Sequence, residues 1–411
     1  MDVNTHRRKN IFGLWEIAMR AVVVHLGYEE FGGAEFFSIR VIEILQCRFD
    51  NVLVLHAGDL PKFEAIMART GISLNPQRVR FQTISKGRRS RFLNRFVPSM
   101  TLFRLGEIRR LAERVVRDGD VVVSTFAEFP FKRAQLVQAL HIPIFVSDRE
   151  SLLYCGVEAC ELRRLFRKIH VWLARKYMGL SSVSLADGPV VVNSHWTAEQ
   201  FRRHYPLADI RVLHHGVSVD LHEGSPGWVP FHEREDSFVI IGRLVKAKRV
   251  ETAIDIIERV RGLGHEVRLK IIGDGTGDYA AEIFKLAESK PWIDMYPNLS
   301  RKELETLVVG QKWGLHCYQF EHYGLAPGEL QALGCITFVH DSGGQVEIID
   351  HPAQRYSDVV DAVKKISLVL SSYQLQVSLI ANAKASIAHH RGEHFVQKFG
   401  SIIEDVAFPQ T

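Results

Sequence analysis

The sequence predicts an α/β fold made of two successive domains, each built on a parallel sheet. Short apolar runs alternate with helical patterns along the chain, and this alternation restarts after a segment rich in glycine and proline. The 411 residues, 46% of them hydrophobic, are enough for two separate cores. We therefore expect a first domain at 1–205, a second at 206–390, and a C-terminal helix within 391–411.

The first half contains five candidate strands. Each is a short run rich in Val, Ile or Leu, as expected of a parallel strand that is buried on both faces. The runs lie at 21–26, 52–56, 120–124, 143–147 and 189–193. Helical patterns lie between them, including one from about Ala34 and one at 105–117.

The second half repeats this organisation. Its candidate strands lie at 238–242, 267–272, 313–316 and 336–340, and its candidate helices lie near 249–262, 278–288, 301–309 and 327–334. Segment 206–236 contains three prolines and three glycines, which favours a connection between the domains.

Basic residues are concentrated in the first half. Residues 1–205 contain 31 Lys and Arg against 20 Asp and Glu, whereas the remainder is acidic. The clusters at 7–9, 86–95 and 163–176 suit an anionic membrane surface or RNA, and equally the solvated faces of ordinary helices. No apolar run is long enough to cross a membrane, and no signal peptide is evident. With five irregularly spaced cysteines, this predicts a cytoplasmic protein that could attach peripherally to a membrane.

Glycine-bearing loops follow the candidate strands. Ligands of parallel sheets bind beyond the carboxyl ends of the strands, where glycine lets the backbone approach closely. A single loop of this kind is weak evidence, because most are ordinary strand-to-helix turns. Four in the second domain, after one in the first, indicate a site. They contain Gly32-Gly33 and, in the second domain, Gly242-Arg243 through Lys248, Gly273-Asp274-Gly275, Glu321 through Glu329, and Ser342 through Glu347.

Two of these loops carry charges suited to a nucleotide sugar. Arg243 and Lys248 precede a helix, and Arg and Lys are the side chains that bind diphosphate oxygens. Glu321 and Glu329 lie eight positions apart, where carboxylates can accept hydrogen bonds from sugar hydroxyls. Each feature alone would more often be a solvated charge or a helix-start glutamate.

Four segments taken together resemble glycosyltransferase family 4: GRLVKAK, IIGDG, FEHYGLAPGELQALGC and DSGGQVEII. Within it, the motifs are most similar to the eukaryotic mannosyltransferases that extend lipid-linked oligosaccharide with α-1,2 linkages. HLGYEEFGGAE, STFAEFPF and VVNSHWT in the first half are also similar to that subgroup. The resemblance implies the GT-B fold: two Rossmann-like domains facing a central cleft, with the last helix crossing back to the N-terminal domain.

The resemblance also implies an activity. A hexose, mannose as the first choice, would pass from a GDP- or UDP-linked donor to a hydroxyl of a glycan or lipid-linked acceptor, and its anomeric configuration would be retained. The first domain would receive the acceptor. No cofactor, metal or nucleic acid is expected, since protein cations would hold the diphosphate.

The resemblance assigns roles to residues in three groups. Arg243, Lys248 and Glu321 would carry catalysis. The donor would contact Gly32, Gly33, Gly242, Gly273, Tyr296, Tyr323, Gly324, Leu325 and Glu329. His25, Asp148 and Arg149 would lie on the sugar or acceptor side.

One segment departs from the family. Relatives often place a histidine near the donor sugar, where this chain has Ser147-Asp148-Arg149-Glu150. Two alternatives to a transferase therefore stay open, namely a GT-B nucleotide-sugar epimerase and a non-catalytic protein that binds a nucleotide sugar or an anionic surface. His25 could be a site residue or a core histidine.

Overall fold

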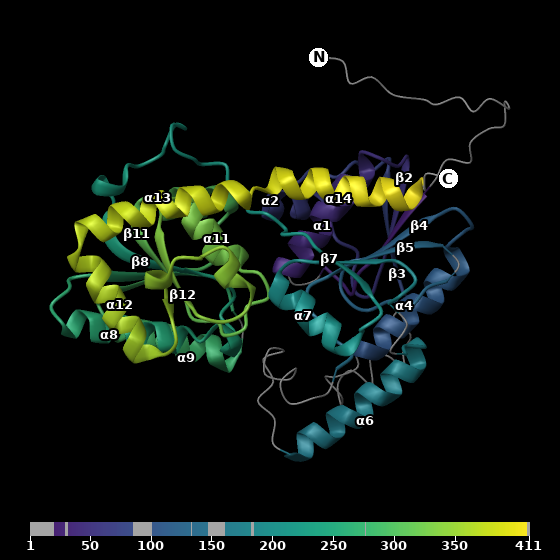
Figure 1. Cartoon of the computed structure of the whole chain (residues 1–411), viewed down its shortest axis with the longest axis horizontal. Helices are drawn as coiled ribbons and strands as arrows, with labels where there is room; N and C mark the ends of the chain where they lie inside the picture. The colour runs from purple at the N-terminus through teal and green to yellow at the C-terminus, as the bar shows by residue number, and fades with distance from the viewer. Residues whose placement is uncertain are drawn as a thin grey trace.

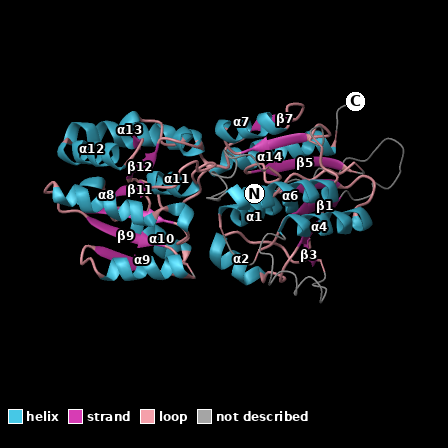
Figure 2. Ribbon diagram, turned by 90° about the horizontal axis from the view of Figure 1, so that it is seen from below, coloured by secondary structure: helices cyan, strands magenta, loops and turns pink. Residues whose placement is uncertain are grey.

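The computed structural model describes residues 20–28, 32–84, 101–132, 134–146, 161–181, 185–275 and 277–408. Within these ranges the chain forms two α/β domains that lie side by side, each with one parallel sheet at its centre (Figure 1). Figure 2 shows both sheets covered by helices on their two faces, which is why their strands are so apolar. The predicted fold class is confirmed.

The first sheet has seven strands in the order β3-β2-β1-β4-β5-β6-β7. All pairs are parallel; in β1, for example, Val22 pairs with Leu53 on one side and Val122 on the other. The order reverses direction between β1 and β4. The strands are β1 Arg20–Val24, β2 Asn51–His56, β3 Val79–Thr83, β4 Val121–Ser124, β5 Gln135–Leu140, β6 Pro189–Val192 and β7 Asp209–Val212.

Helices bury both faces of this sheet. One core joins the sheet to α1, and a second lies between the sheet, α4 and α6. The described helices of this domain are α1 Gly33–Gln46, α2 Phe63–Thr70, α4 Thr101–Val115, α6 Glu161–Met178 and α7 His195–His204.

The second sheet repeats the same topology with six strands, in the order β10-β9-β8-β11-β12-β13. They are β8 Glu235–Ile241, β9 Arg268–Ile272, β10 Ile293–Tyr296, β11 Gln311–His316, β12 Ile336–His340 and β13 Arg355–Tyr356. The helices are α8 Val250–Gly262, α9 Asp278–Glu288, α10 Arg301–Val308, α11 Leu325–Ala332, α12 Val359–Ser371 and α13 Tyr373–His389. Short 3₁₀ turns occur at Phe231–Glu233, Lys246–Lys248, Gly344–Glu347 and Pro352–Gln354.

One predicted strand is wrong. The described part of 143–147 is a loop, and the strand of this region is β5, Gln135–Leu140. The backbone N–H groups of Ile144 and Phe145 donate to the buried carboxylate of Glu128 instead of to a neighbouring strand. The apolar run at 143–146 is therefore buried by packing without joining the sheet.

The connection between the domains is shorter than predicted. β7 lies inside 206–236 but is the edge strand of the first sheet, where it pairs with β6. The chain crosses next to the point where it later returns: Val217 N–H donates to His390 O, and Gly392 N–H donates to Val217 O. Gly216 has φ +73°, and a Cβ there would lie 2.5 Å from the Cα of Gly392. Glycine is therefore required at this double crossing.

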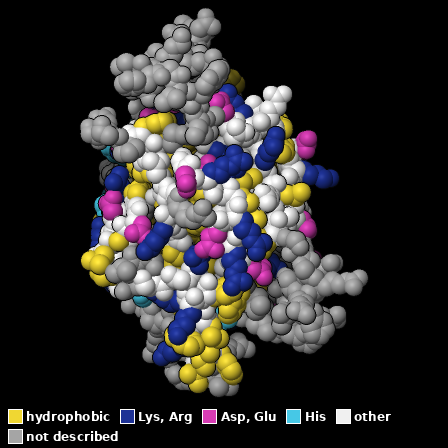
Figure 3. Space-filling view, turned by 90° about the vertical axis from the view of Figure 1, so that its right-hand side faces the viewer, with side chains coloured by type: hydrophobic (Ala, Val, Ile, Leu, Met, Phe, Trp, Pro, Cys, Tyr) yellow, Lys and Arg dark blue, Asp and Glu magenta, His cyan; other side chains and the backbone are white. Residues whose placement is uncertain are grey.

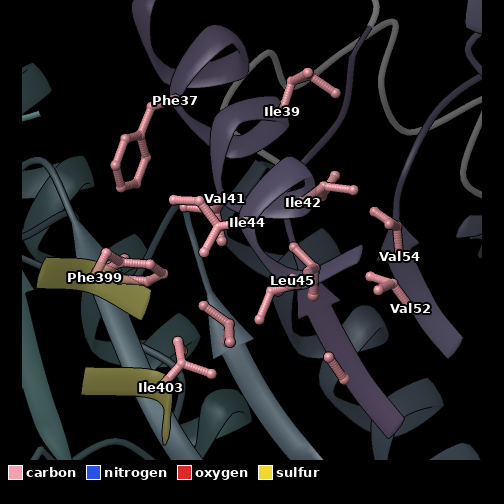
Figure 4. Close-up of a cluster of buried hydrophobic side chains, with 14 of the residues drawn as sticks. Phe37, Ile39, Val41, Ile42, Ile44, Leu45, Val52, Val54, Phe399 and Ile403 are labelled. Carbon is pink, nitrogen blue, oxygen red and sulfur yellow. The ribbon is translucent and has the colours of Figure 1, made fainter. Parts of the chain in front are cut away.

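The last helix, α14 Gly392–Ala407, returns to the first domain (Figure 1). Its buried face carries Phe395, Phe399, Ile403 and Ala407, which join the core beneath α1. Figure 4 shows Phe399 and Ile403 facing side chains of α1, including Val41 and Ile44. The prediction of a C-terminal helix that crosses back is confirmed.

Candidate active site

The predicted donor residues of the second domain gather at the point where its sheet reverses order. β8 and β11 are neighbours there, and the helices that follow them lie on opposite faces, which leaves a crevice at the carboxyl ends of the strands. Arg243 and Lys248 follow β8, and Glu321 follows β11. The topology thus brings Lys248 into contact with Glu321, 73 positions further along the chain, and Arg243 lies in the same segment after β8 as Lys248.

Lys248 and Glu321 form an ion pair. Lys248 Nζ donates to Glu321 Oε2 over 2.8 Å, and the two side chains are 24% and 16% exposed. The same ammonium lies 4.7 Å from the centre of the Tyr318 ring, which adds a cation–π contact. Lys248 is therefore held in place by an ion pair and a ring contact.

A buried histidine completes this group. His316 Nε2 lies 3.1 Å from the Glu321 oxygen that Lys248 contacts. Burial by itself would raise the pKa of Glu321, but Lys248 and His316 outweigh it and hold that pKa well below its usual range. Burial, followed by the charge of Lys248, lowers the pKa of His316. Glu321 is accordingly an anion at neutral pH and an acceptor of hydrogen bonds.

The first domain contributes the N-terminus of α1. A Cβ on Gly32 would lie 3.3 Å from a guanidinium nitrogen of Arg243, so the missing side chain makes room for that arginine. Gly33 lies opposite Leu325, because a Cβ on Gly33 would lie 3.7 Å from Leu325 Cδ1. Arg243 therefore meets Gly32, and Leu325 meets Gly33, across the boundary between the domains.

α11 begins at Leu325, whose side chain faces Gly33, and its N-cap is Gly324, which has φ +105° and no side chain to accept from the first amides of the helix. Gly32, the N-cap of α1, likewise has no side chain for this purpose, and its own N–H donates to Glu35 Oε2 over 2.8 Å. Unsatisfied N–H groups and the positive end of the helix dipole favour an anion at α11.

Glu329 lies in the first part of α11 and is held by an arginine. Arg301 Nη1 donates to Glu329 Oε1 over 2.7 Å, and Arg301 Nε donates to the buried Glu305 over 2.7 Å. Glu305 in turn accepts from the backbone of Asp220 and Leu221 in the connection between the domains. Arg301 and Glu305 escaped sequence analysis because a basic and an acidic residue four apart are common on any exposed helix.

Two of the predicted glycines, Gly242 and Gly273, allow their loops to approach each other closely. A Cβ on Gly273 would lie 1.9 Å from the carbonyl oxygen of Gly242, so these loops touch at the ends of β8 and β9. Gly242 itself has φ +145°. Tyr296 ends β10 and packs, partly buried, against the apolar cluster beside α10 and α11.

Tyr323 is buried at the crossing between the domains. Its hydroxyl lies 3.2 Å from His390 Nδ1, and its ring stacks on His214. Burial raises its pKa above the usual range. The side chain of Tyr323 is therefore part of the packing at the crossing between the domains, and only its backbone is left to contact a ligand.

His25 directly follows β1 and is fully buried. Its Nδ1 lies 3.0 Å from Thr125 Oγ1, and its Nε2 lies 4.0 Å from Glu35. Burial, followed by the charges of His141 and His56, lowers its pKa to about 3, so the ring is neutral. Asp148 and Arg149, the other residues predicted on the acceptor side, lie outside the described residues, as do the basic clusters at 7–9 and 86–95.

A set of contacts between the domains was missed by sequence analysis. Ser194, the N-cap of α7, donates to the carbonyl of His322 over 2.6 Å, next to Glu321. The carboxylate of Glu347 accepts from the backbone of His195 and Trp196 at 3.1 Å and lies 2.9 Å from His214 Nε2. These residues hold the Glu321 loop against the first domain.

Comparison with protein families finds a match in the second domain. Residues 229–386 match the family of glycosyl transferases group 1. A GDP-Man:Man(3)GlcNAc(2)-PP-Dol alpha-1,2-mannosyltransferase of Mus musculus is 24% identical over 243 residues, which are 51% of this chain and 47% of the mouse protein. The chain thus aligns with about half the length of this curated relative.

Solved structures match the whole arrangement. HepE of Anabaena in complex with UDP and glucose has a TM-score of 0.64 at 16% identity, and the match covers 94% of this chain and all of that one. Sucrose-phosphate synthase of Thermosynechococcus elongatus has a TM-score of 0.68 at 14% identity, with 94% and 99% covered. WaaG, a glycosyltransferase of lipopolysaccharide biosynthesis, has a TM-score of 0.64 at 17% identity, with 93% and 99% covered. These likenesses establish the two-domain fold.

Proposed function

We propose that this chain is a GT-B glycosyltransferase that transfers a hexose from a nucleoside-diphosphate sugar to a hydroxyl of a glycan or lipid-linked acceptor. The match of residues 229–386 to the glycosyl transferases group 1 family and the two-domain fold shared with solved neighbours support this proposal. The observation that carries this proposal is the ion pair of Lys248 with Glu321 at the point where β8 and β11 separate, with Arg243 in the same segment after β8 as Lys248. Mannose is the first candidate for the sugar, supported by the name of the mouse relative.

The donor diphosphate lies between Arg243, Lys248 and the first amides of α11. When the bond between the anomeric carbon and the phosphate oxygen breaks, negative charge grows on the leaving diphosphate. Fixed cations and amides stabilise that charge more in the transition state than in the ground state, which lowers the barrier. These groups supply the stabilisation without a metal ion, so the reaction requires no metal and no cofactor.

Glu321 binds hydroxyls of the transferred sugar. Its ionised carboxylate, with Lys248 and His316 on one oxygen, can accept hydrogen bonds on the other. Glu329 contacts the ribose, with Arg301 fixing its orientation. The acceptor oxygen bonds to the anomeric carbon on the face from which the diphosphate leaves, and its proton passes to the leaving phosphate oxygen. This pathway retains the anomeric configuration and depends on positioning more than on a protein base.

The acceptor binds to the first domain, close to Gly33 and the end of β1. Several solved neighbours bind UDP or UDP-glucose, whereas the mouse relative is named for GDP-mannose. Both bases are therefore tested. An anionic membrane surface, on the cytoplasmic side, is the proposed location of a lipid-linked acceptor and suits the basic first half of the chain.

The test measures thermal stabilisation by UDP, GDP and ADP and by their hexose conjugates. A nucleotide at about 100 times its dissociation constant adds roughly 2.7 kcal/mol to the stability of a single-site protein. We expect one base to stabilise the protein selectively and Glu321→Gln to weaken the effect of the sugar conjugate more than that of the nucleotide. The selected donor is then incubated with and without mannosylated lipid acceptors.

Each alternative gives a distinct result. Turnover of the donor to another sugar nucleotide without acceptor would identify an epimerase. Thermal stabilisation by a nucleotide sugar, without consumption of that donor in the presence of any acceptor, would identify a non-catalytic binding protein. No stabilisation by any nucleotide would contradict the donor site itself. Nuclear magnetic resonance of the new glycosidic bond distinguishes retention from inversion.

A further inference from the structure

Helix α6 exposes apolar side chains where a surface helix ordinarily exposes charges. Within the described residues no helix is long and apolar enough to cross a membrane. The exposed side chains of α6 nevertheless include five large apolar residues within nine positions, each between 44% and 64% exposed. They are Leu165, Phe166, Ile169, Trp172 and Leu173.

These five residues form one stripe, which we call the α6 outer face. Their spacing follows the helical repeat, so the side chains lie on one side of α6. The opposite side packs on the first domain through the buried residues Val171, Ala174 and Met178. α6 is therefore apolar on two opposite sides, only one of which is covered by the domain.

Two arginines of α6 are turned toward the protein. Arg175 Nη1 donates to the carbonyl of Phe145 over 3.0 Å, and Arg167 Nη2 donates to the carbonyl of Ile144 over 3.2 Å. The guanidinium groups thus anchor the helix, and the apolar residues face outward. This is the reverse of the usual arrangement of an exposed amphipathic helix.

Lysines accompany the α6 outer face. Lys176 Nζ lies 4.4 Å from the centre of the Trp172 ring, and Lys168 is exposed beside Ile169. A tryptophan with a lysine ammonium over its ring suits the boundary between lipid headgroups and acyl chains, where both can be satisfied at once. In Figure 1, α6 lies at the lower edge of the first domain, away from α14. Figure 3 shows hydrophobic side chains with Lys and Arg beside them at that edge.

We propose that the α6 outer face is a docking surface for an anionic lipid bilayer. Its apolar side chains insert among the acyl chains, and its lysines pair with anionic headgroups, so the helix lies in the plane of the interface. The face is convex and projects from one helix, which suits a planar, deformable surface better than a preformed protein groove. The inference rests on the lipid-linked acceptor of the proposed function, because it names the element that brings the enzyme to that acceptor.

Flotation of the full chain with vesicles tests the proposal. One set of vesicles contains phosphatidylcholine alone, and the other contains phosphatidylcholine with 30% phosphatidylserine, about the anionic content needed for a strongly negative surface. We expect the wild type to float with the anionic vesicles. Phe166→Ser combined with Trp172→Ser should weaken partitioning at least tenfold, because the two largest insertable side chains are lost. Lys168→Glu combined with Lys176→Glu should weaken it on anionic vesicles only.

The matched control is Leu368→Ser combined with Tyr373→Ser, which removes two exposed apolar side chains from α12 and α13. It should float like the wild type. Wild type that stays unbound, or α6 variants that float as well as the control, would overturn the proposal. A wild-type dimer that Phe166→Ser and Trp172→Ser dissociate, as seen by sedimentation, would assign the face to a second copy of the chain and also overturn it.

Nucleotide stabilisation of the same variants separates the two proposals. All α6 variants should keep the thermal shift of the wild type, because α6 lies outside the donor crevice. Vesicle binding without any nucleotide shift would support the α6 outer face and contradict the donor site. A nucleotide shift without vesicle binding would do the opposite.

Discussion

Replacement of Lys248 by alanine is the most direct test of the active-site geometry. In the wild type its ammonium lies 2.8 Å from Glu321 and 4.7 Å from the ring of Tyr318. The substitution removes the cation assigned to the donor diphosphate. We expect a loss of about 100-fold in transfer rate, the size of effect that follows removal of one donor from a developing oxyanion.

Stability should fall as well. Removing one partner of a buried ion pair costs about 3–5 kcal/mol. Lys248 retains 24% of its side-chain exposure, so water partly replaces it, and we expect a loss of about 2 kcal/mol. The wild-type carboxyl has a lowered pKa, so the pair stabilises the fold above the ordinary pKa of about 4.5 and loses this effect as the pH falls through the lowered value. Without Lys248 the buried carboxyl of the variant takes up its proton at a higher pH than the wild-type carboxyl does, so the difference in stability should begin to shrink at about pH 4.5 or above and go on shrinking as the pH falls.

The assay follows donor consumption and thermal unfolding between pH 4 and pH 8 for Lys248→Ala, Lys248→Arg and Lys246→Ala. Lys248→Arg keeps the charge and should lose less activity than Lys248→Ala. Lys246→Ala removes an exposed lysine from the same turn and should change the rate by no more than a few fold. Without Lys248 the effect of burial on Glu321 prevails, so the acid limb of the rate profile should move to higher pH. The reasoning fails if Lys248→Ala behaves like Lys246→Ala in rate and in pH profile.

Four further outcomes are expected. Glu347→Gln removes the carboxylate that caps α7 and contacts His214, and should lower the unfolding free energy by about 1–2 kcal/mol in urea, whereas the exposed Glu393→Gln should not. Phe399→Ala empties a fully buried position between α14 and α1 and should cost about 3–5 kcal/mol in the same titration. Arg301→Ala should raise the KM for the donor more than it lowers kcat, since Glu329 loses its anchor; equal effects on both would argue for a role at the reacting centre. Prior treatment with a chelator should leave the transfer rate unchanged, and restoration of a lost rate by added Mg²⁺ or Mn²⁺ would contradict the metal-free proposal.

Local sequence determined the strands whose burial is continuous. The runs at 52–56, 120–124, 238–242 and 336–340 are mostly apolar, because both faces of a parallel strand are covered, and the ends of each lie within three residues of the ends of a strand. β5 was missed because Gln135 and Gln138 interrupt its apolar run. β7 was missed because its alternating charges are typical of a partly exposed edge, which a local pattern cannot distinguish from a loop.

The predicted strand at 143–147 shows why burial alone does not define a strand. Phe145 and Val146 are as buried as strand residues. Their segment nevertheless hydrogen-bonds to the carboxylate of Glu128, which lies on a different loop. Only the tertiary structure decides where backbone hydrogen bonds go when a distant side chain can replace a neighbouring strand.

The sequence also singled out Arg243, Lys248, Glu321 and Glu329, through their loops and the family they resemble. It could not pair them, because the pairs are set by strand order. β8 and β11 are neighbours although 69 residues separate the end of one from the start of the other, and this adjacency places Lys248 on Glu321. His316 and Arg301 acquire their roles in the same way. The sequence alone determined which charged residue types are present in these loops. The order of the strands decided which of the charges meet, because electrostatic interactions depend on distance in space and not on separation along the chain.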